Sequence, residues 1–311
     1  MDNVVRRFLV SAVALGLATV SSSSLADPDL ARAGRAAGYA HQATSSLETV
    51  STPEVIRALF GTGNRPVKSP TRIWQVLEHG EKVECLSCIP MVSTLLYNSH
   101  PKTREIAAWW LRRRIFGVFG PGEVYSQVVA TLGNATETET HRAYAANALG
   151  EFLTHSGAKY LATAIRTDAS PMVRQASIRS LQRMNTLGPN NEISFAMADE
   201  SSTVRLAAVE ASTRIYAFTD VESVVARVDD ESVDVRRAAV LAIGTMRAAD
   251  AVDGLIALTS RDNELDPSVR KAAVWALGQI ADPSATDAVQ GALNDSDGFV
   301  RDAARVALAR L

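Results

Sequence analysis

The chain has two cysteines, Cys85 and Cys88, and only two residues separate them in the stretch "VECLSCIP". Pairs with this spacing occur in haem attachment sites, zinc sites and redox-active disulfides. Haem attachment requires a histidine directly after the second cysteine, whereas Ile89 follows here. A structural zinc ion requires four ligands, and the nearest histidines, His79 and His100, have no recognisable ligand spacing. We therefore expect no metal and no cofactor at this pair.

The N-terminal segment has the features of a secretory signal peptide. Arg6 and Arg7 precede an apolar stretch, residues 8–20, that is shorter than a typical membrane span. Small residues then occupy the −3 and −1 positions of a cleavage site that ends at Ala26. We expect cleavage after Ala26 and a periplasmic or secreted protein that is not attached to a membrane. An uncleaved N-terminal anchor is the alternative.

Export makes a disulfide the simplest state of the Cys85–Cys88 pair. A redox role remains an alternative, because a helix that begins after Cys88 would stabilise a thiolate. No β-α-β pattern of the thioredoxin kind surrounds the pair, which argues against the redox role. A disulfide that closes so short a loop gains little stability from chain entropy, which argues against a structural role. We favour a structural disulfide over a catalytic one.

The composition predicts a helical globular protein without nucleic-acid-binding character. Alanine is abundant and favours helix, because it loses no side-chain entropy there. A net charge of −2 argues against a protein that holds nucleic acid electrostatically. The sequence contains no nucleophile elbow, phosphate loop or paired metal-binding histidines, so we predict no catalytic residues and no metal site.

A motif of Val-Arg followed by small and aliphatic residues recurs about every 31 residues from Arg174 onward, and weaker matches without the valine place Arg142 and Arg104 in the same register. Three residues after the arginine the side chain is always small, and seven residues after it the side chain is aliphatic in all copies but one. These positions share one face of a helix. A repeat of this length accommodates two helices, which must stack on neighbouring repeats to bury their apolar faces. The arginines are Arg104, Arg142, Arg174, Arg205, Arg236, Arg270 and Arg301.

The motif resembles the HEAT repeat, most clearly in "VRKAAVWALGQIADPSATDAV", and is most similar to the short repeats of phycobilisome-lyase-type proteins. The resemblance covers about residues 89–311 and implies an all-α fold, a right-handed α-α superhelix of the HEAT/ARM kind. We divide the chain into the signal peptide at 1–26, an N-terminal spacer or loosely docked helical cap at 27–68, and the HEAT-repeat solenoid at 69–311.

An acidic residue stands six positions before the arginine in five successive repeats. The helix dipole does not favour a cation near the start of a helix, so a recurrent arginine there indicates a partner. A carboxylate of its own or a neighbouring repeat matches the guanidinium, and we predict an Asp/Arg ladder along the solenoid. Solvated surface charges are the alternative. The predicted members are Asp168, Arg174, Asp199, Arg205, Asp230, Arg236, Glu264, Arg270, Asp295 and Arg301.

Two adjacent tryptophans precede an arginine cluster in one repeat. Trp110 occupies a position that is small in every other repeat, so we predict that it packs in the interior. Trp109 lies five residues after its arginine, where the residue type varies between repeats as on an exposed surface. Aromatic and arginine side chains are enriched at binding hot spots. Our candidates for partner binding are Trp109, Arg112, Arg113, Arg179 and Trp275.

The repeat array predicts a non-catalytic exported scaffold that binds a protein partner through the concave face of the solenoid. One alternative is a redox accessory protein that uses Cys85 and Cys88. The other is a bilin-lyase-like enzyme, because similar repeats occur in lyases that attach bilins to cysteines of light-harvesting proteins. The signal peptide argues against that cytoplasmic role.

Overall fold

The computed structural model describes residues 69–82, 88–115, 122–185 and 190–311. The predicted signal peptide, the segment at 27–68 and Cys85 lie outside these ranges, so what was expected of them stays a prediction. The chain divides into two units, Met1–Val50 and Ser51–Leu311, and every described residue belongs to the second.

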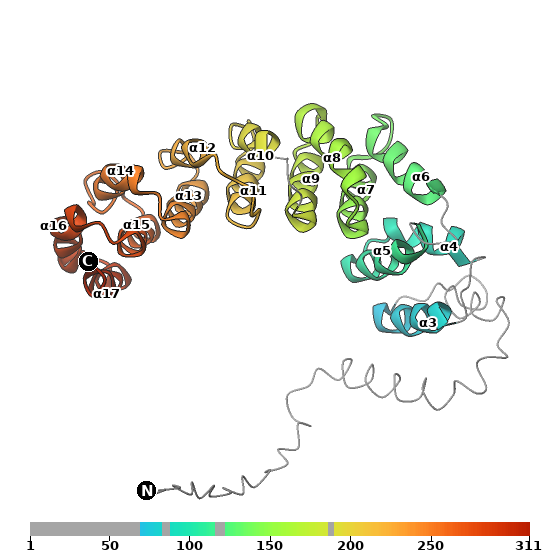
Figure 1. Ribbon diagram of the computed structural model, residues 1–311, viewed down its shortest axis with the longest axis horizontal. Coiled ribbons are helices and arrows are strands. Elements are labelled where there is room, and N and C mark those ends of the chain that lie inside the picture. Colours follow the sequence, from blue (N-terminus) through green and yellow to red (C-terminus); the bar gives the residue numbers. More distant parts are fainter. Residues whose placement is uncertain (1–68, 83–87, 116–121, 186–189) are drawn as a thin grey trace, which may run out of the picture. The chain divides into compact units, whose positions relative to one another are not determined.

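The predicted all-α solenoid is confirmed: the regular structure of the described residues consists of helices, without a strand among them. None of these helices has both the length and the apolar character needed to cross a membrane. After α3 (Pro70–Lys82), helices alternate between two rows, and within this unit the second row lies on the inner side of an arc (Figure 1).

The outer row contains the first and shorter helix of each pair, and 3₁₀ turns extend three of these helices. Its members are α4 (Ile89–Thr94) with η2 (Leu95–Tyr97), α6 (Gly122–Gly133), α8 (His155–Thr167), α10 (Asn190–Ala196), α12 (Val221–Val225), η3 (Ala249–Ala251) with α14 (Val252–Ala257), and η4 (Pro283–Ala285) with α16 (Thr286–Gly291) and η5 (Ala292–Asn294).

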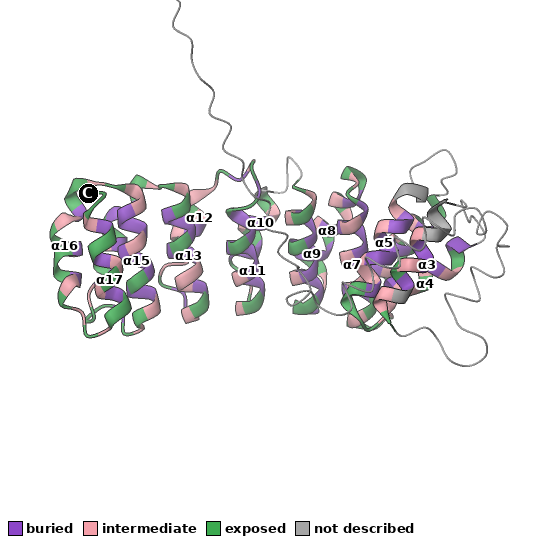
Figure 2. Cartoon of the chain, turned by 90° about the horizontal axis from the view of Figure 1, so that it is seen from below, coloured by how far each residue is buried: buried purple, intermediate pink, exposed green. Residues whose placement is uncertain are grey.

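The inner row contains the helices that carry the repeat arginines. Its members are α5 (Pro101–Ile115), α7 (Glu139–Phe152), α9 (Pro171–Met184), α11 (Ser202–Ser212), α13 (Val233–Met246), α15 (Pro267–Ile280) and α17 (Gly298–Leu308). Figure 2 shows that the buried residues of these helices alternate with exposed and intermediate ones.

The helical spacing read from the motif places the core between the two rows. In α15, the residues one before, three after and seven after the arginine are Val269, Ala273 and Leu277, and all three are fully buried. Trp110 is fully buried as well, which confirms its predicted interior position. Each helix thus buries one apolar face against its neighbours, as stacked repeats require.

Glycines allow some inner-row helices to approach each other closely. A Cβ atom at Gly244 would lie 2.7 Å from Cα of Ala276, and one at Gly278 would lie 2.8 Å from Cα of Ala307. Real Cβ atoms do not come so near to a backbone atom, so the packing of α15 against α13 and α17 depends on the missing side chains.

Candidate functional site

The structure forms the Asp/Arg ladder, and each paired arginine reaches the carboxylate of the following repeat. Arg205 Nε lies 2.7 Å from Asp230 Oδ2, and Arg205 Nη2 lies 2.8 Å from Asp230 Oδ1. Both side chains are almost completely buried, and the bidentate geometry matches the guanidinium to the carboxylate. The same arrangement joins Arg142 to Asp168, Arg174 to Asp199, Arg236 to Glu264 and Arg270 to Asp295.

Each arginine–carboxylate pair, which we call a rung of the ladder, also forms hydrogen bonds with the backbone of two turns. Arg205 Nη1 donates a hydrogen bond of 2.9 Å to the backbone oxygen of Asp199, in the turn before its own helix. Asp230 Oδ1 accepts a hydrogen bond of 2.9 Å from the backbone N–H of Ser232, in the turn of the next repeat. One arginine therefore contacts two successive turns, which explains the cation at the start of the inner helices from α7 to α15.

In the pairs Arg205–Asp230 and Arg270–Asp295, the pKa values of both partners are shifted in the direction that favours the charged forms. Burial by itself raises the pKa of Asp230, but hydrogen bonds from Arg205 and from the Ser232 amide outweigh it, so the pKa is lowered. Hydrogen bonds from Arg270 likewise lower the pKa of Asp295. The hydrogen-bonded carboxylate of Asp230 raises the pKa of Arg205 above its ordinary value. Asp230 and Asp295 are therefore anions at neutral pH.

The ladder does not extend to every repeat. Thr136 stands where the later repeats have the turn acid, and Arg104 instead lies over the ring of Tyr144, with Cζ 3.8 Å from the ring centroid. Arg301, a predicted member, donates to the backbone oxygen of Asp295 but forms no ion pair with any described residue. The rungs thus connect the repeats from α7 to α17.

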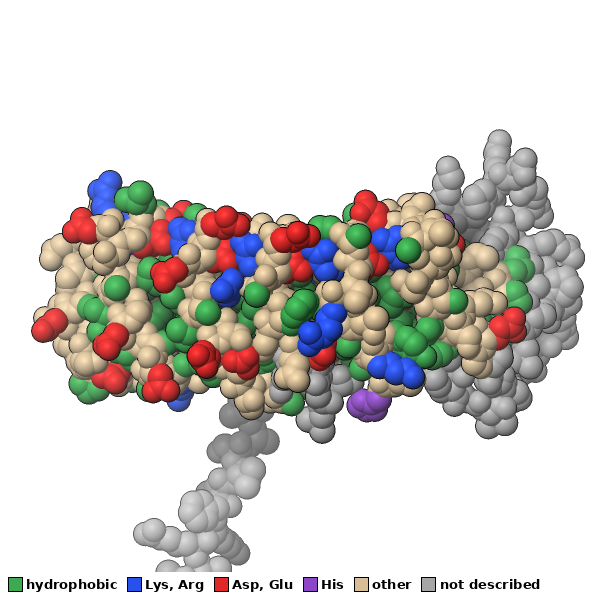
Figure 3. All heavy atoms as spheres, turned by 90° about the horizontal axis from the view of Figure 1, so that it is seen from above, with side chains coloured by type: hydrophobic (Ala, Val, Ile, Leu, Met, Phe, Trp, Pro, Cys, Tyr) green, Lys and Arg blue, Asp and Glu red, His purple; other side chains and the backbone are tan. Residues whose placement is uncertain are grey.

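Basic and acidic side chains alternate along one edge of the solenoid, as Figure 3 shows. In the ladder these charges neutralise each other in pairs that are largely buried. The ladder is therefore a device that holds repeats together rather than a charged surface for a partner.

The candidate residues for partner binding lie on the inner row but not at one site. Trp109 is partly covered by Trp74 of α3, with ring centroids 5.2 Å apart and an angle of 18° between the planes. Arg112 lies one turn further along α5 and is partly exposed, while the side chain of Arg113 lies outside what the structure describes. Arg179 on α9 and Trp275 on α15 line two separate depressions.

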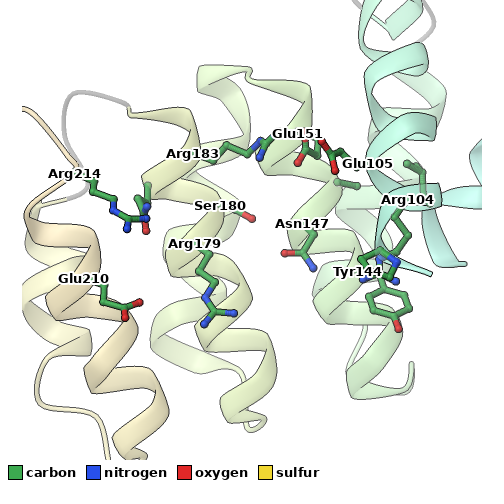
Figure 4. A pocket seen from close by; sticks show the side chains of 14 residues that line it. Arg104, Glu105, Tyr144, Asn147, Glu151, Arg179, Ser180, Arg183, Glu210 and Arg214 are labelled. Atoms are coloured by element: carbon green, nitrogen blue, oxygen red, sulfur yellow. Dashed lines mark ion pairs between the residues drawn. The ribbon is translucent and has the colours of Figure 1, made fainter. Parts of the chain in front are cut away.

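The first depression, the polar hollow, is lined by charged side chains of α5, α7, α9 and α11 (Figure 4). Arg183 Nη2 lies 2.7 Å from Glu151 Oε2. Burial raises the pKa of Glu151, and the positive charge of Arg183 opposes that shift. Arg179, Glu210 and Arg214 form no ion pair with the described residues, so their charges remain available to a partner.

The second depression, the apolar groove, lies over α13, α15 and α17. Its large apolar side chains are Leu241, Trp275, Phe299 and Val306. Phe299 and Val306 are 71% and 57% exposed, far more than side chains of this kind in a packed core. The groove is therefore a solvent-exposed apolar surface on the inner row.

The sequence reasoning missed most of the apolar groove, although a signal was present. Leu241, Trp275 and Val306 each lie five residues after their repeat arginine, in the variable position already recognised. Phe299 stands seven residues before Val306, which places both on the same face of α17. The apolar residues at this exposed position in three successive repeats were the signal that could have indicated the groove.

Cys88 lies directly before α4 and is almost fully buried. Because Cys85 lies outside the described residues, both the structural disulfide and the redox role stay predictions. In the described ranges, no group of three or more histidine, cysteine, aspartate or glutamate side chains has a geometry that would hold a metal ion.

Comparisons with known proteins agree with this architecture. A family model described as HEAT repeats matches residues 221–309. No curated protein matches the chain. The X-ray structure of YibA from Escherichia coli is 12% identical, with a TM-score of 0.55, and the match covers 92% of this chain and 98% of that chain.

Two further solved structures are similar to the chain. A chain from the structure of Kap95p with RanGDP is 14% identical with a TM-score of 0.55, over 83% of this chain and 40% of that chain. The complex of CpcE and CpcF of phycocyanin lyase from Nostoc sp. PCC7120 is 17% identical, over 81% of this chain and 98% of that chain, but its TM-score of 0.39 gives the lyase alternative no support. At these identities the likeness concerns the fold alone. Residues 221–309 thus match the HEAT-repeat model, and the paired helices of the described residues form a solenoid similar to those of HEAT-repeat proteins.

Proposed function

We propose that this protein is a non-catalytic, exported scaffold that binds a protein partner along the inner row of its solenoid. The observation that carries the proposal is the contrast between neighbouring positions on the inner helices. Three and six residues after each arginine the side chains are buried and small, apart from Trp110. Five residues after it they vary, from Arg179 and Glu210 to Trp275 and Val306, and are partly or fully exposed.

A position that is exposed and differs between repeats contributes little to stacking, so it is free to provide specificity for a partner. Kap95p binding induces the switch loops of RanGDP to adopt the GTP-bound conformation, which is a property of that protein. It illustrates that such a scaffold acts by contact with another protein. The ladder carboxylates Asp199, Asp230 and Asp295, by contrast, are buried and paired with arginines, which supports a structural role for them.

Affinity capture with surface variants tests the binding role. The full chain is used to capture proteins from a periplasmic extract, beside the variants Arg179→Glu on the inner row and Lys159→Glu on the outer helix α8. Both substitutions reverse a charge on an exposed side chain. We expect a stoichiometric partner that Lys159→Glu retains and Arg179→Glu weakens or loses. Recovery of no partner over several growth conditions, or equal loss with both variants, would contradict the proposal.

Export is tested by the mass of the mature protein. We expect a chain that begins at Asp27, because the predicted cleavage follows Ala26. A protein that retains its first 26 residues in cells that export other proteins normally would contradict export with cleavage.

A further inference from the structure

No described residue covers the apolar groove, since Phe299 and Val306 remain largely exposed, and the wall formed by Trp275 is held in place by the packing around it. An added Cβ at Gly244 would lie 2.8 Å from Cζ3 of Trp275, so the indole ring packs directly on the backbone of α13. Gly278 lets α17 approach α15 in the same way. The ring of Trp275 is therefore fixed in the floor of the groove before any partner arrives, which reduces the entropic cost of binding.

The charges around the groove are not balanced. Arg237 is neutralised by Asp234, at 2.7 Å, and Arg305 by Asp302. Lys271 and Arg310 form no ion pair with any described residue. Lys271 Nζ lies 5.5 Å from the ring centroid of Phe299, so this cation stands beside the apolar surface. After the internal pairs are subtracted, the rim of the groove is positive.

We propose that the apolar groove binds a short acidic segment of a partner protein, one that carries large apolar side chains between its carboxylates. The apolar side chains would cover Leu241, Trp275, Phe299 and Val306, and the carboxylates would pair with Lys271 and Arg310. The inference rests on the proposed function and names the chemistry of the partner at one part of the inner row.

The positive charge around the groove also argues against a second copy of this chain as the molecule that binds there. A symmetric dimer through the groove would place Lys271 and Arg310 of one protomer near the same residues of its partner. Like charges brought together at an interface oppose association. A nucleic acid would satisfy the cations but would leave the exposed apolar side chains without a matching surface.

Labelled peptides measure the preference directly on the full chain. The first peptide consists of leucine, phenylalanine and glutamate, the second has lysine in place of glutamate, and the third has serine in place of leucine and phenylalanine. We expect fluorescence anisotropy to show binding of the first, binding of the second weaker by at least about tenfold, and none of the third. Equal binding of the first two peptides would overturn the proposal.

Two pairs of matched variants locate the binding. Phe299→Asp and Lys271→Glu alter the groove, while Phe195→Asp and Lys159→Glu make the same changes on the outer row. Phe195 is also exposed and has a cation, Arg166, 4.7 Å from its ring centroid, and Lys159 likewise lies near an aromatic ring. Each groove variant should weaken binding of the acidic peptide by about tenfold, and neither control should change it. Because Lys271 is an exposed charge, its variant tests the idea even where Phe299→Asp disturbs folding.

Two results would overturn this inference while leaving the proposed function in place. One is a captured partner that Arg179→Glu loses but both groove variants retain, which would assign binding to the polar hollow. The other is a dimer, seen by analytical ultracentrifugation of the peptide-free protein, that Phe299→Asp dissociates. A captured partner that no inner-row variant affects would contradict the proposed function itself, whatever the peptides do.

Discussion

The buried arginine is the residue on which the repeats depend, because each one serves two turns at once. Its Nε and Nη2 atoms meet the carboxylate of the next repeat, and its Nη1 atom meets backbone oxygens of its own turn. A buried ion pair is not necessarily a net source of stability, since both charges lose their hydration. Removing one member is costly in any case, because the other charge stays buried without a partner.

We therefore predict that Arg205→Ala lowers the free energy of unfolding by about 3–5 kcal/mol. It leaves the Asp230 carboxylate buried and the backbone oxygen of Asp199 without its donor. Arg237→Ala is the control, because its pair with Asp234 is largely exposed and should contribute about 0.5 kcal/mol or less. Urea denaturation measures both, and similar losses for the two variants would contradict a stabilising role for burial of the rung.

The same carboxylates predict how stability depends on pH. The pKa values of Asp230 and Asp295 are lowered in the folded state, so the unfolded chain binds more protons as acid is added. Their contribution is complete above the ordinary aspartate value of about 4 and is lost as the pH falls through the lowered values.

Urea midpoints followed from neutral to acid pH should fall most steeply below about pH 4. Asp295→Asn should be less stable at neutral pH and should flatten this dependence. Asp234→Asn, at an exposed carboxylate, should leave its slope unchanged. An unaltered slope for Asp295→Asn would show that this carboxylate is not stabilised as an anion.

At the scale of the helix, close packing between inner-row elements depends on single glycines. Gly244→Ala should reduce stability by about 1–3 kcal/mol, because the new methyl group would meet Cα of Ala276 and the ring of Trp275. Gly254→Ala on α14 is the matched control, since no atom lies within 4 Å of its added Cβ, and alanine there should stabilise the helix by up to about 1 kcal/mol. Thermal unfolding of both variants checks the prediction. A loss of stability in Gly254→Ala would contradict the idea that only a close neighbouring atom makes alanine unfavourable at these glycines.

The helices themselves were predictable because apolar spacing around each arginine has a helical period. The partner of each arginine was not, since the acid of its own turn and that of the next repeat occur at equally regular spacing. Only the stacking of the repeats brings Asp199, 25 residues away, to Arg174. Similarly, Leu241, Trp275 and Val306 belong to three different repeats. The pattern within one repeat does not predict that these three side chains line the same groove.

At the scale of the whole molecule, the main helix contacts among the described residues of the second unit lie within a repeat or between adjacent repeats, so the stability of each repeat depends mostly on its neighbours. The repeat of Arg104 has no rung, because Thr136 replaces the turn acid. Local stability should therefore be lower in α5 than in α9, whose repeat has rungs on both sides.

Hydrogen exchange measured by mass spectrometry should show faster exchange in α5 than in α9. Arg174→Ala removes one rung and should bring the exchange of α9 nearer to that of α5. Protection in α5 equal to that in α9 of the unmodified protein would contradict the idea that the rungs set the order of local opening.

The ladder also has a direction, because every paired arginine reaches toward the following repeat. Arg301 donates a hydrogen bond to the backbone oxygen of Asp295 in its own turn, but its guanidinium forms no ion pair with a carboxylate of the described residues. The array can therefore be lengthened by design from that end. An appended repeat whose turn supplies an aspartate six residues before its own arginine would be recognised by a side chain that is already in position.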